Sequence, residues 1–135
     1  MMDPAEFIRT IYLGDRACKS IIVDGWAEEV RVQVDCISRV RGETWNYYRE
    51  ENLVDGFIVF EGVNRIDWDP GGKIPNDAFQ SLTVESCEER EGKYVFSLEI
   101  SSWDHEAKAF FPVHLKIYAN AIALEAKEGH VRIRS

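Results

Sequence analysis

The neighbours Asp104 and His105 are the best candidates for proton-transfer chemistry in this chain. An aspartate beside an imidazole can orient it as a general acid or base. His114 is the alternative, and it falls in a stretch where apolar and polar residues alternate. A zinc site would need three or four converging ligands, and neither these two histidines nor His130 has a metal-type spacing. We therefore expect neither a metal nor a cofactor.

Residues 68–77 form a stretch without apolar periodicity that holds two of the four prolines. Asp67 and Asp69 are spaced as in an EF-hand calcium loop, but Gly71 and Ala78 stand where that loop needs oxygen ligands. We interpret the stretch as a structured loop that can carry function. The binding residues that we expect here and near the acid–histidine pair are Trp68, Asp69, Trp103, Asp104 and His105.

Residues 39–49 have the most unusual local composition, with three arginines and three aromatic residues. Aromatic side chains beside arginine bind single-stranded nucleic acid, and both residue types are enriched at protein-binding hot spots. On a strand, one face of this stretch would be core, and the pattern leaves open which one. The candidate binding residues from this stretch are Arg41, Trp45, Tyr47, Tyr48 and Arg49.

The charge balance restricts the partners. The chain has 24 acidic and 16 basic residues and a formal net charge of −8. Because phosphates repel such a domain, we expect no binding to nucleic acid or to a membrane surface. The same charge favours a basic protein partner, which we expect to contact the acids of residues 85–91 and the aromatic residues 45–48.

Cysteine usage and the N-terminal residues predict a cytoplasmic protein. Cys18, Cys36 and Cys87 are odd in number and widely spaced, as expected of reduced thiols, and we interpret each as a small buried apolar residue. The chain begins without the basic start and long apolar stretch of a signal peptide. The oligomeric state is left open.

A length of 135 residues predicts a single domain, residues 1–135. Asp3, Pro4 and Gly14 are typical of the ends of a short helix over residues 3–13. After it, apolar residues recur mostly at every second position, which predicts strands. The expected strands are residues 17–23, 30–36, 44–49, 57–66, 79–85, 94–100, 111–118, 122–126 and 131–134.

These elements predict a mainly β (α+β) fold. We expect an antiparallel curved sheet, a sandwich or a partly open barrel, with one short N-terminal helix. The turn signals between the runs, such as Asp24-Gly25 and Glu91-Gly92, favour antiparallel neighbours.

Four segments resemble a small family of single-domain bacterial proteins of unknown function. They are Tyr12-Leu13-Gly14-Asp15-Arg16-Ala17-Cys18-Lys19-Ser20, Ile37-Ser38-Arg39, Trp45-Asn46-Tyr47-Tyr48 and Asp55-Gly56-Phe57-Ile58-Val59-Phe60. The resemblance implies no activity, cofactor or catalytic residue. In size, charge and β-richness the chain is also loosely similar to small acidic immunity proteins that are paired with bacterial toxins.

Three functions follow from these observations. The first is a non-enzymatic protein-binding module, an immunity-type inhibitor of a basic partner. The second is a small-ligand-binding β-barrel with Trp68 or Trp103 near the mouth of its pocket. The third, ranked last, is an enzyme that uses Asp104 with His105, or His114, as acid and base.

Overall fold

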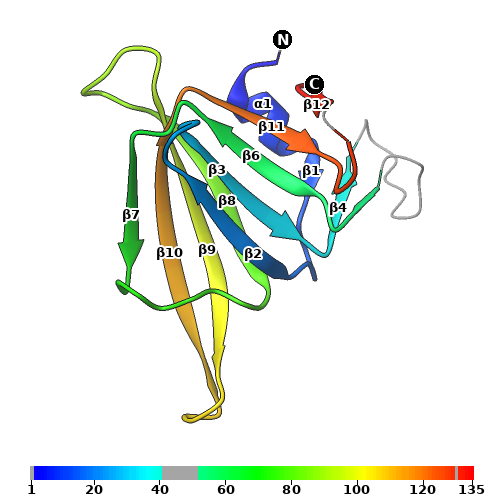
Figure 1. Ribbon diagram of the computed structural model, residues 1–135, viewed down its shortest axis with the longest axis vertical. Helices are drawn as coiled ribbons and strands as arrows, with labels where there is room; N and C mark the ends of the chain where they lie inside the picture. The colour runs from blue at the N-terminus through cyan, green and yellow to red at the C-terminus, as the bar shows by residue number, and fades with distance from the viewer. Residues whose placement is uncertain (1, 41–51, 130) are drawn as a thin grey trace.

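The alternating apolar residues form the facing sides of two antiparallel sheets. The computed structural model describes residues 2–40, 52–129 and 131–135 (Figure 1). A five-stranded sheet has the order β12 (Arg132–Ile133), β11 (Ala121–Glu125), β6 (Phe57–Glu61), β3 (Glu29–Val34) and β2 (Cys18–Asp24). A four-stranded sheet has the order β7 (Arg65–Asp69), β10 (Ala109–Ala119), β9 (Tyr94–Asp104) and β8 (Phe79–Ser86). Together they form a sandwich-like fold, which confirms the expected mainly β class, and the described strands do not close into a barrel.

The core lies between these two sheets. Its most buried side chains come from every second residue of the central strands, as the alternation predicts. Phe60 of β6 and Phe96 of β9 meet across the layers with ring centroids 5.1 Å apart. Residues 57–60 are buried on both sides of their strand, which confirms the expectation from the continuous apolar run.

The two sides of the sandwich are closed differently. The helix α1 (Pro4–Arg9) lies between β8 and β11 and buries Phe7 in the core (Figure 1). A small sheet of β1 (Ile11–Tyr12), β4 (Cys36–Arg39) and β5 (Leu53–Val54) extends the covered side. The opposite side is bounded by the end strands β2 and β7, and no helix in the described ranges covers it. The helix has six residues, so no described helix is long and apolar enough to cross a membrane.

Three predicted elements differ from the structure. The helix ends at Arg9 and not at residue 13, because Ile11 and Tyr12 pair with β4. The expected strand 30–36 divides at Asp35, whose carboxylate accepts hydrogen bonds from the backbone amides of Ala17 and Cys36. These bonds hold the bend between β3 and β4, which belong to different sheets.

The expected strand 57–66 also divides between two sheets. β6 ends at Glu61, and Gly62 follows with a φ of +67°, a conformation that favours glycine. β7 then begins at Arg65 and pairs with β10. The expected strand 44–49 lies outside the described residues.

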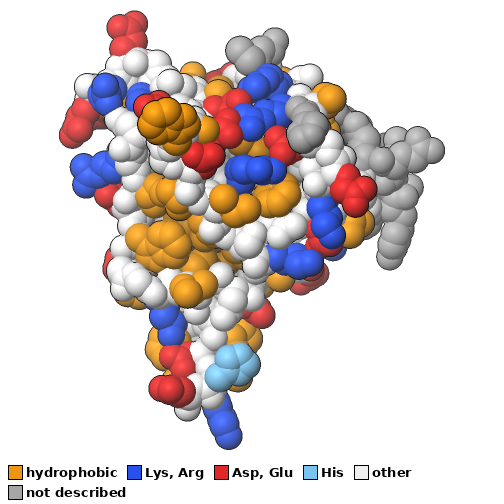
Figure 2. All heavy atoms as spheres, in the orientation of Figure 1, with side chains coloured by type: hydrophobic (Ala, Val, Ile, Leu, Met, Phe, Trp, Pro, Cys, Tyr) orange, Lys and Arg blue, Asp and Glu red, His pale blue; other side chains and the backbone are white. Residues whose placement is uncertain are grey.

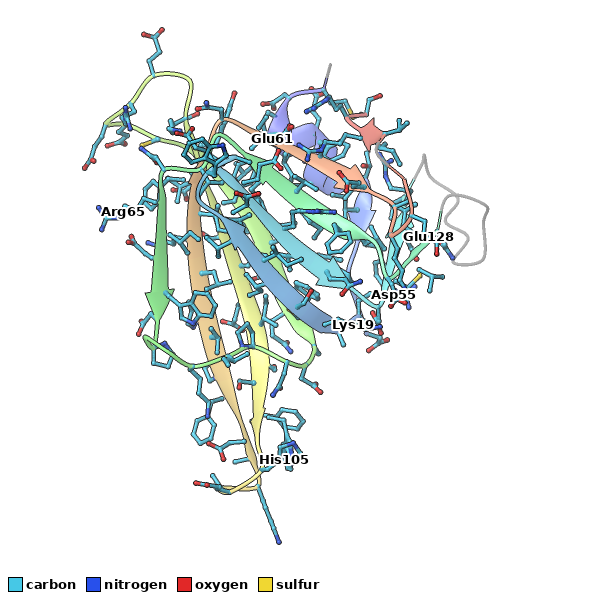
Figure 3. All side chains as sticks on the ribbon, in the orientation of Figure 1. Lys19, Asp55, Glu61, Arg65, His105 and Glu128 are labelled. Atoms are coloured by element: carbon cyan, nitrogen blue, oxygen red, sulfur yellow. The ribbon has the colours of Figure 1, made fainter. Side chains whose placement is uncertain are left out.

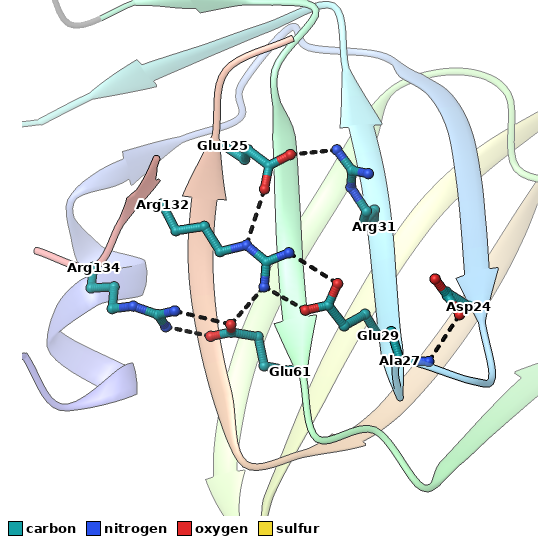
Figure 4. Close-up of polar contacts among 8 residues, drawn as sticks. All are labelled: Asp24, Ala27, Glu29, Arg31, Glu61, Glu125, Arg132 and Arg134. Atoms are coloured by element: carbon teal, nitrogen blue, oxygen red, sulfur yellow. Dashed lines mark hydrogen bonds and ion pairs between the residues drawn. The ribbon is translucent and has the colours of Figure 1, made fainter. Parts of the chain in front are cut away.

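A charged cluster on the outer face of the five-stranded sheet fastens its end strand, β12, to the other strands (Figure 4). Arg132 donates through Nε to Glu125 at 3.0 Å, through Nη1 to Glu61 at 2.6 Å and through Nη2 to Glu29 at 2.9 Å. Arg31 donates to the other oxygen of Glu125 at 2.5 Å. One guanidinium thus joins β12 to glutamates of three further strands, and all three glutamate side chains are at most 21% exposed.

We expect Arg132→Ala to destabilise the protein by about 2 kcal/mol, because it leaves half-buried glutamates without their shared cation. Arg134 and Arg132 hold the pKa of Glu61 below its ordinary value of 4.5. A lowered pKa stabilises the fold above the ordinary value and stops doing so as pH falls through the folded-state value. The difference between wild type and variant should therefore shrink in acid. Urea unfolding at pH 7 and at pH 3 measures both effects.

Arg65→Ala is the matched control, because Arg65 pairs with Asp67 on an exposed surface. Arg65→Ala should lower the free energy of unfolding clearly less than Arg132→Ala does. Equal losses for the two variants would contradict a structural role for the cluster.

Candidate protein-binding surface

The β9–β10 hairpin extends beyond its neighbours and forms a protruding arm (Figure 1). β8 pairs with β9 only as far as Ile100, and β7 pairs with β10 only from His114 onward. We call residues 101–112 the arm. Its two strands pair with each other without a break, with Phe110 opposite Trp103 and Ala109 opposite Asp104.

The loop that follows β7 braces one edge of the arm. The side chain of Asn76 accepts a hydrogen bond from the Trp103 amide at 2.7 Å and donates to the Trp103 carbonyl at 3.2 Å. Its amide group therefore pairs with the strand much as a neighbouring backbone would. Ser102 donates to the carbonyl of Ile74 at 2.6 Å, and the Trp68 indole donates to the carbonyl of Lys73 at 2.6 Å.

Asp104 ties the tip of the arm to the same loop. One carboxylate oxygen accepts from Lys73 Nζ at 2.7 Å, and the other accepts from the backbone amides of Glu106 and Ala107. The hydrogen bond from Lys73 and the two backbone bonds lower the pKa of Asp104 to about 2. The carboxylate is thus committed to holding the turn of the arm, in which Lys108 has a positive φ of 52°.

Apolar side chains remain exposed on this braced arm. Phe110 is 58% exposed and packs against Trp103 with ring centroids 4.8 Å apart. Phe111 is 40% exposed on the other face, with Lys73 Nζ 4.9 Å from its ring centroid, and Ile74 is 69% exposed. Aromatic side chains held rigid in this way are typical anchors of protein–protein contacts.

The structure brings four of the sequence-predicted residues into or against the arm. Trp103, Asp104 and His105 lie in it, with His105 at the tip (Figure 3), and Trp68 contacts the loop that braces it. Asp69 lies at the end of β7, next to Trp68 and opposite His114 in the strand register. The other predicted binding residues, Arg41, Trp45, Tyr47, Tyr48 and Arg49, lie outside the described residues.

The acid–histidine pair is not assembled as an acid–base dyad. Asp104 directs its carboxylate to Lys73 and to the turn, while the ring of His105 lies edge-on to Trp103, 6.3 Å between centroids. His114 stands on the uncovered face of the four-stranded sheet, with Nε2 3.6 Å from Glu99. His130 lies outside the described residues, and among the described ones no group of three His, Cys, Asp or Glu side chains is placed to hold a metal ion.

The acids of residues 85–91 form one wall of a surface hollow of about 540 Å³. The β8–β9 turn supplies Glu88 and Glu89, and the opposite wall contains Arg65 and Tyr118. Arg90 and Lys93 also line the hollow, so its acids and bases balance. This turn lies at the end of the molecule away from the arm (Figure 1).

All three cysteines lie in the described part of the chain and carry free thiols. Cys18 is buried, as expected, and burial raises its pKa to about 11. Cys36 and Cys87 are only partly buried, so the interpretation as small buried residues is wrong for these two.

Sequence reasoning missed two exposed aromatic residues. Phe110 stands next to Phe111 on one strand, and adjacent aromatic residues on a strand point to opposite faces, so one of them had to leave the core. Trp26 follows the turn signal Asp24-Gly25 and is fully exposed. Its place in a tight turn between two strands was the available signal.

Comparison with known proteins gives one match. The model of a family of unknown function, DUF6258, matches residues 2–135. No curated protein and no solved structure matches the chain.

We expect the carboxyl group of Asp104 to titrate with a midpoint near pH 2 in the folded protein. Lys73→Met should move the midpoint up toward 3.8, because the largest stabilising contact of the charged form is lost. The folded-state pKa lies below the unfolded one, so Asp104 stabilises the arm above about pH 4 and ceases to do so as pH falls through 2. Carbon-detected NMR titration of the carboxyl group measures the midpoint.

Lys108→Met is the matched control, since it removes a lysine of the same turn that makes no side-chain bond to Asp104 among those the structure gives. A midpoint that stays near 2 in Lys73→Met would refute the brace described above.

Proposed function

Since this chain belongs to a family of unknown function, DUF6258, we propose a role from its own surface: it is a protein-binding module that uses the arm as its principal contact. The observation that carries this proposal is the exposure of Phe110, which packs against the half-buried Trp103, and of Phe111 on the other face of the same braced, protruding hairpin. Exposed apolar side chains lower the solubility of a protein, and a partner that covers them removes this effect.

The bracing supports a binding role. Asn76, Ser102 and Asp104 hold the arm by hydrogen bonds to the loop and to its own turn. A contact surface that is rigid before binding loses less conformational entropy when the partner arrives. The aromatic residues of the arm therefore satisfy both conditions of a hot spot, size and preorganisation.

The partner that we propose is a basic protein. The net charge of −8 attracts such a partner over distance and raises the association rate at low salt. A small acidic domain that holds a basic enzyme inactive is an immunity-type inhibitor, and this is the finer form of the proposal. The contact through residues 45–48 stays a prediction, because that stretch lies outside the described residues.

The experiment captures the partner and then tests the arm. The immobilised full chain is exposed to a lysate of the source organism at low salt, eluted with a salt step, and the eluate is identified by mass spectrometry. We expect one basic protein near a one-to-one ratio. With that protein purified, Phe110→Ser should raise the dissociation constant about 30-fold, because one aromatic anchor is lost.

Val54→Ser is the matched control, because Val54 is 68% exposed on the small sheet and away from the arm. It should bind as the wild type does. If Phe110→Ser binds as tightly as the wild type, the arm is not the principal contact. If the association rate does not change with salt, the electrostatic attraction of the partner is refuted.

A further inference from the structure

The five-stranded sheet ends on β2, and no described strand pairs with its outer edge. The start of β2 is occupied, because the backbone amide of Cys18 donates to the carbonyl of Asp77. The rest of this seven-residue strand presents a row of backbone donors and acceptors to solvent. Ile22 is 43% exposed and Val23 is 58% exposed on this strand, and the fully exposed Trp26 follows in the turn to β3. An open edge with apolar side chains is a template for a further strand.

The inward face of this edge is apolar and uncovered. Ile21 lies opposite Val32 and Val23 lies opposite Val30, and both partners are buried in the core. Val23 therefore points to the core side of the sheet and yet remains exposed. Figure 2 shows apolar side chains gathered on this side of the molecule, in the region between β2 and β7 of the same view.

A hollow of about 440 Å³ lies beside the inward face of the edge. Val23 and Val30 form one wall, and Val63 and Ile66 form the other. Ile66 lies opposite Ile117 in the register, so it too faces the core side of its sheet. The space left by the missing cover is thus lined from both sheets and has room for apolar side chains of an added strand.

The charges around the hollow are mainly negative. Asp24, Glu28 and Glu29 line it, against the single base Arg65. Glu29 pairs with Arg132 and Arg65 pairs with Asp67, so Asp24 and Glu28 are the acids left to face an added strand. Asp24 accepts a backbone hydrogen bond from Ala27, which fixes its place at the end of the edge (Figure 4). Basic side chains on an added strand would meet these acids.

The strand at the other edge of the same sheet indicates the sequence pattern that an added strand needs. There β12 pairs with β11, with Ile133 opposite the buried Leu124 and Arg132 opposite Glu125 on the outer face. The sequence of this segment, Val131-Arg132-Ile133-Arg134, alternates apolar and basic residues. Over the two residues that pair, the sheet therefore already accepts this pattern, with Ile133 inward and Arg132 on glutamates.

We propose that the β2 edge takes up, as an added β-strand, an extended segment of a partner protein that alternates apolar and basic residues. Its apolar side chains enter the hollow beside Val23, and its basic side chains lie near Asp24 and Glu28 at the end of the edge. A second copy of this chain fits less well, because its β2 strand contains one basic residue, Lys19, and does not alternate apolar and basic residues. The proposal is independent of the arm.

The test measures binding of a fluorescent eight-residue peptide, Val-Arg-Ile-Arg-Val-Arg-Ile-Arg, to the full chain by anisotropy. We expect saturable one-to-one binding. Val23→Lys should weaken it at least about tenfold, because a lysine then stands at the hollow and repels the peptide. Val54→Lys, an equal charge change at an exposed site on the small sheet, and Phe110→Ser on the arm should leave it unchanged. Melting temperatures confirm that each variant is folded.

Two further peptides test the strand geometry on the wild type. A peptide that is N-methylated at every residue has no backbone donor on either edge and should lose binding. A peptide of the same composition with its arginines in one block should bind at least about tenfold more weakly. Binding of the block peptide as tight as that of the alternating one would overturn the proposal in favour of charge alone. Unchanged binding by Val23→Lys, or a wild-type dimer that this variant abolishes, would overturn it too.

Discussion

The contact between the inward faces of the two sheets is the interaction on which the rest of the molecule depends. Phe60 and Phe96 meet at its centre, and side chains from every second position of the long strands fill the space around them. Burial of these apolar faces is the main source of stability, and it sets the two layers at a fixed separation. Everything outside the contact either covers a side of the sandwich or extends from it.

The chain treats its uncovered regions in three different ways. The helix closes one side by burying Phe7 between the layers. The edge at β11 is closed by a strand that Arg132 fastens to three glutamates. The edge at β2 and the arm are left open, and the arm is stiffened by Asn76 and Asp104 instead of being covered. Exposed apolar surface is therefore confined mostly to two places, each with its own rigid support.

The sequence was sufficient to predict where most strands lie, but it was insufficient to predict which strands and side chains contact one another. Alternation identified the buried faces of β3, β9 and β10, because burial on one face has a period of two whatever the neighbouring strand is. It missed the bend at Asp35, since a strand that changes sheets keeps the same alternation. It found Trp103 and Asp104, but their contacts Lys73 and Asn76 are 31 and 27 residues away, and no local pattern encodes such a pairing. Trp26 was missed although it follows the turn signal Asp24-Gly25, because exposure was predicted for the strands and not for the turn between them.

The acids beside the open edge also govern how the protein behaves when it is concentrated. At neutral pH, Asp24 and Glu28 place negative charge beside an apolar strand edge. This charge opposes association of two copies through their open edges. As pH falls toward the isoelectric point, the net charge of the whole chain falls toward zero while the apolar edge stays as it is. We therefore expect solutions that are clear at neutral pH to turn cloudy in mild acid, because the repulsion between copies is then weakest.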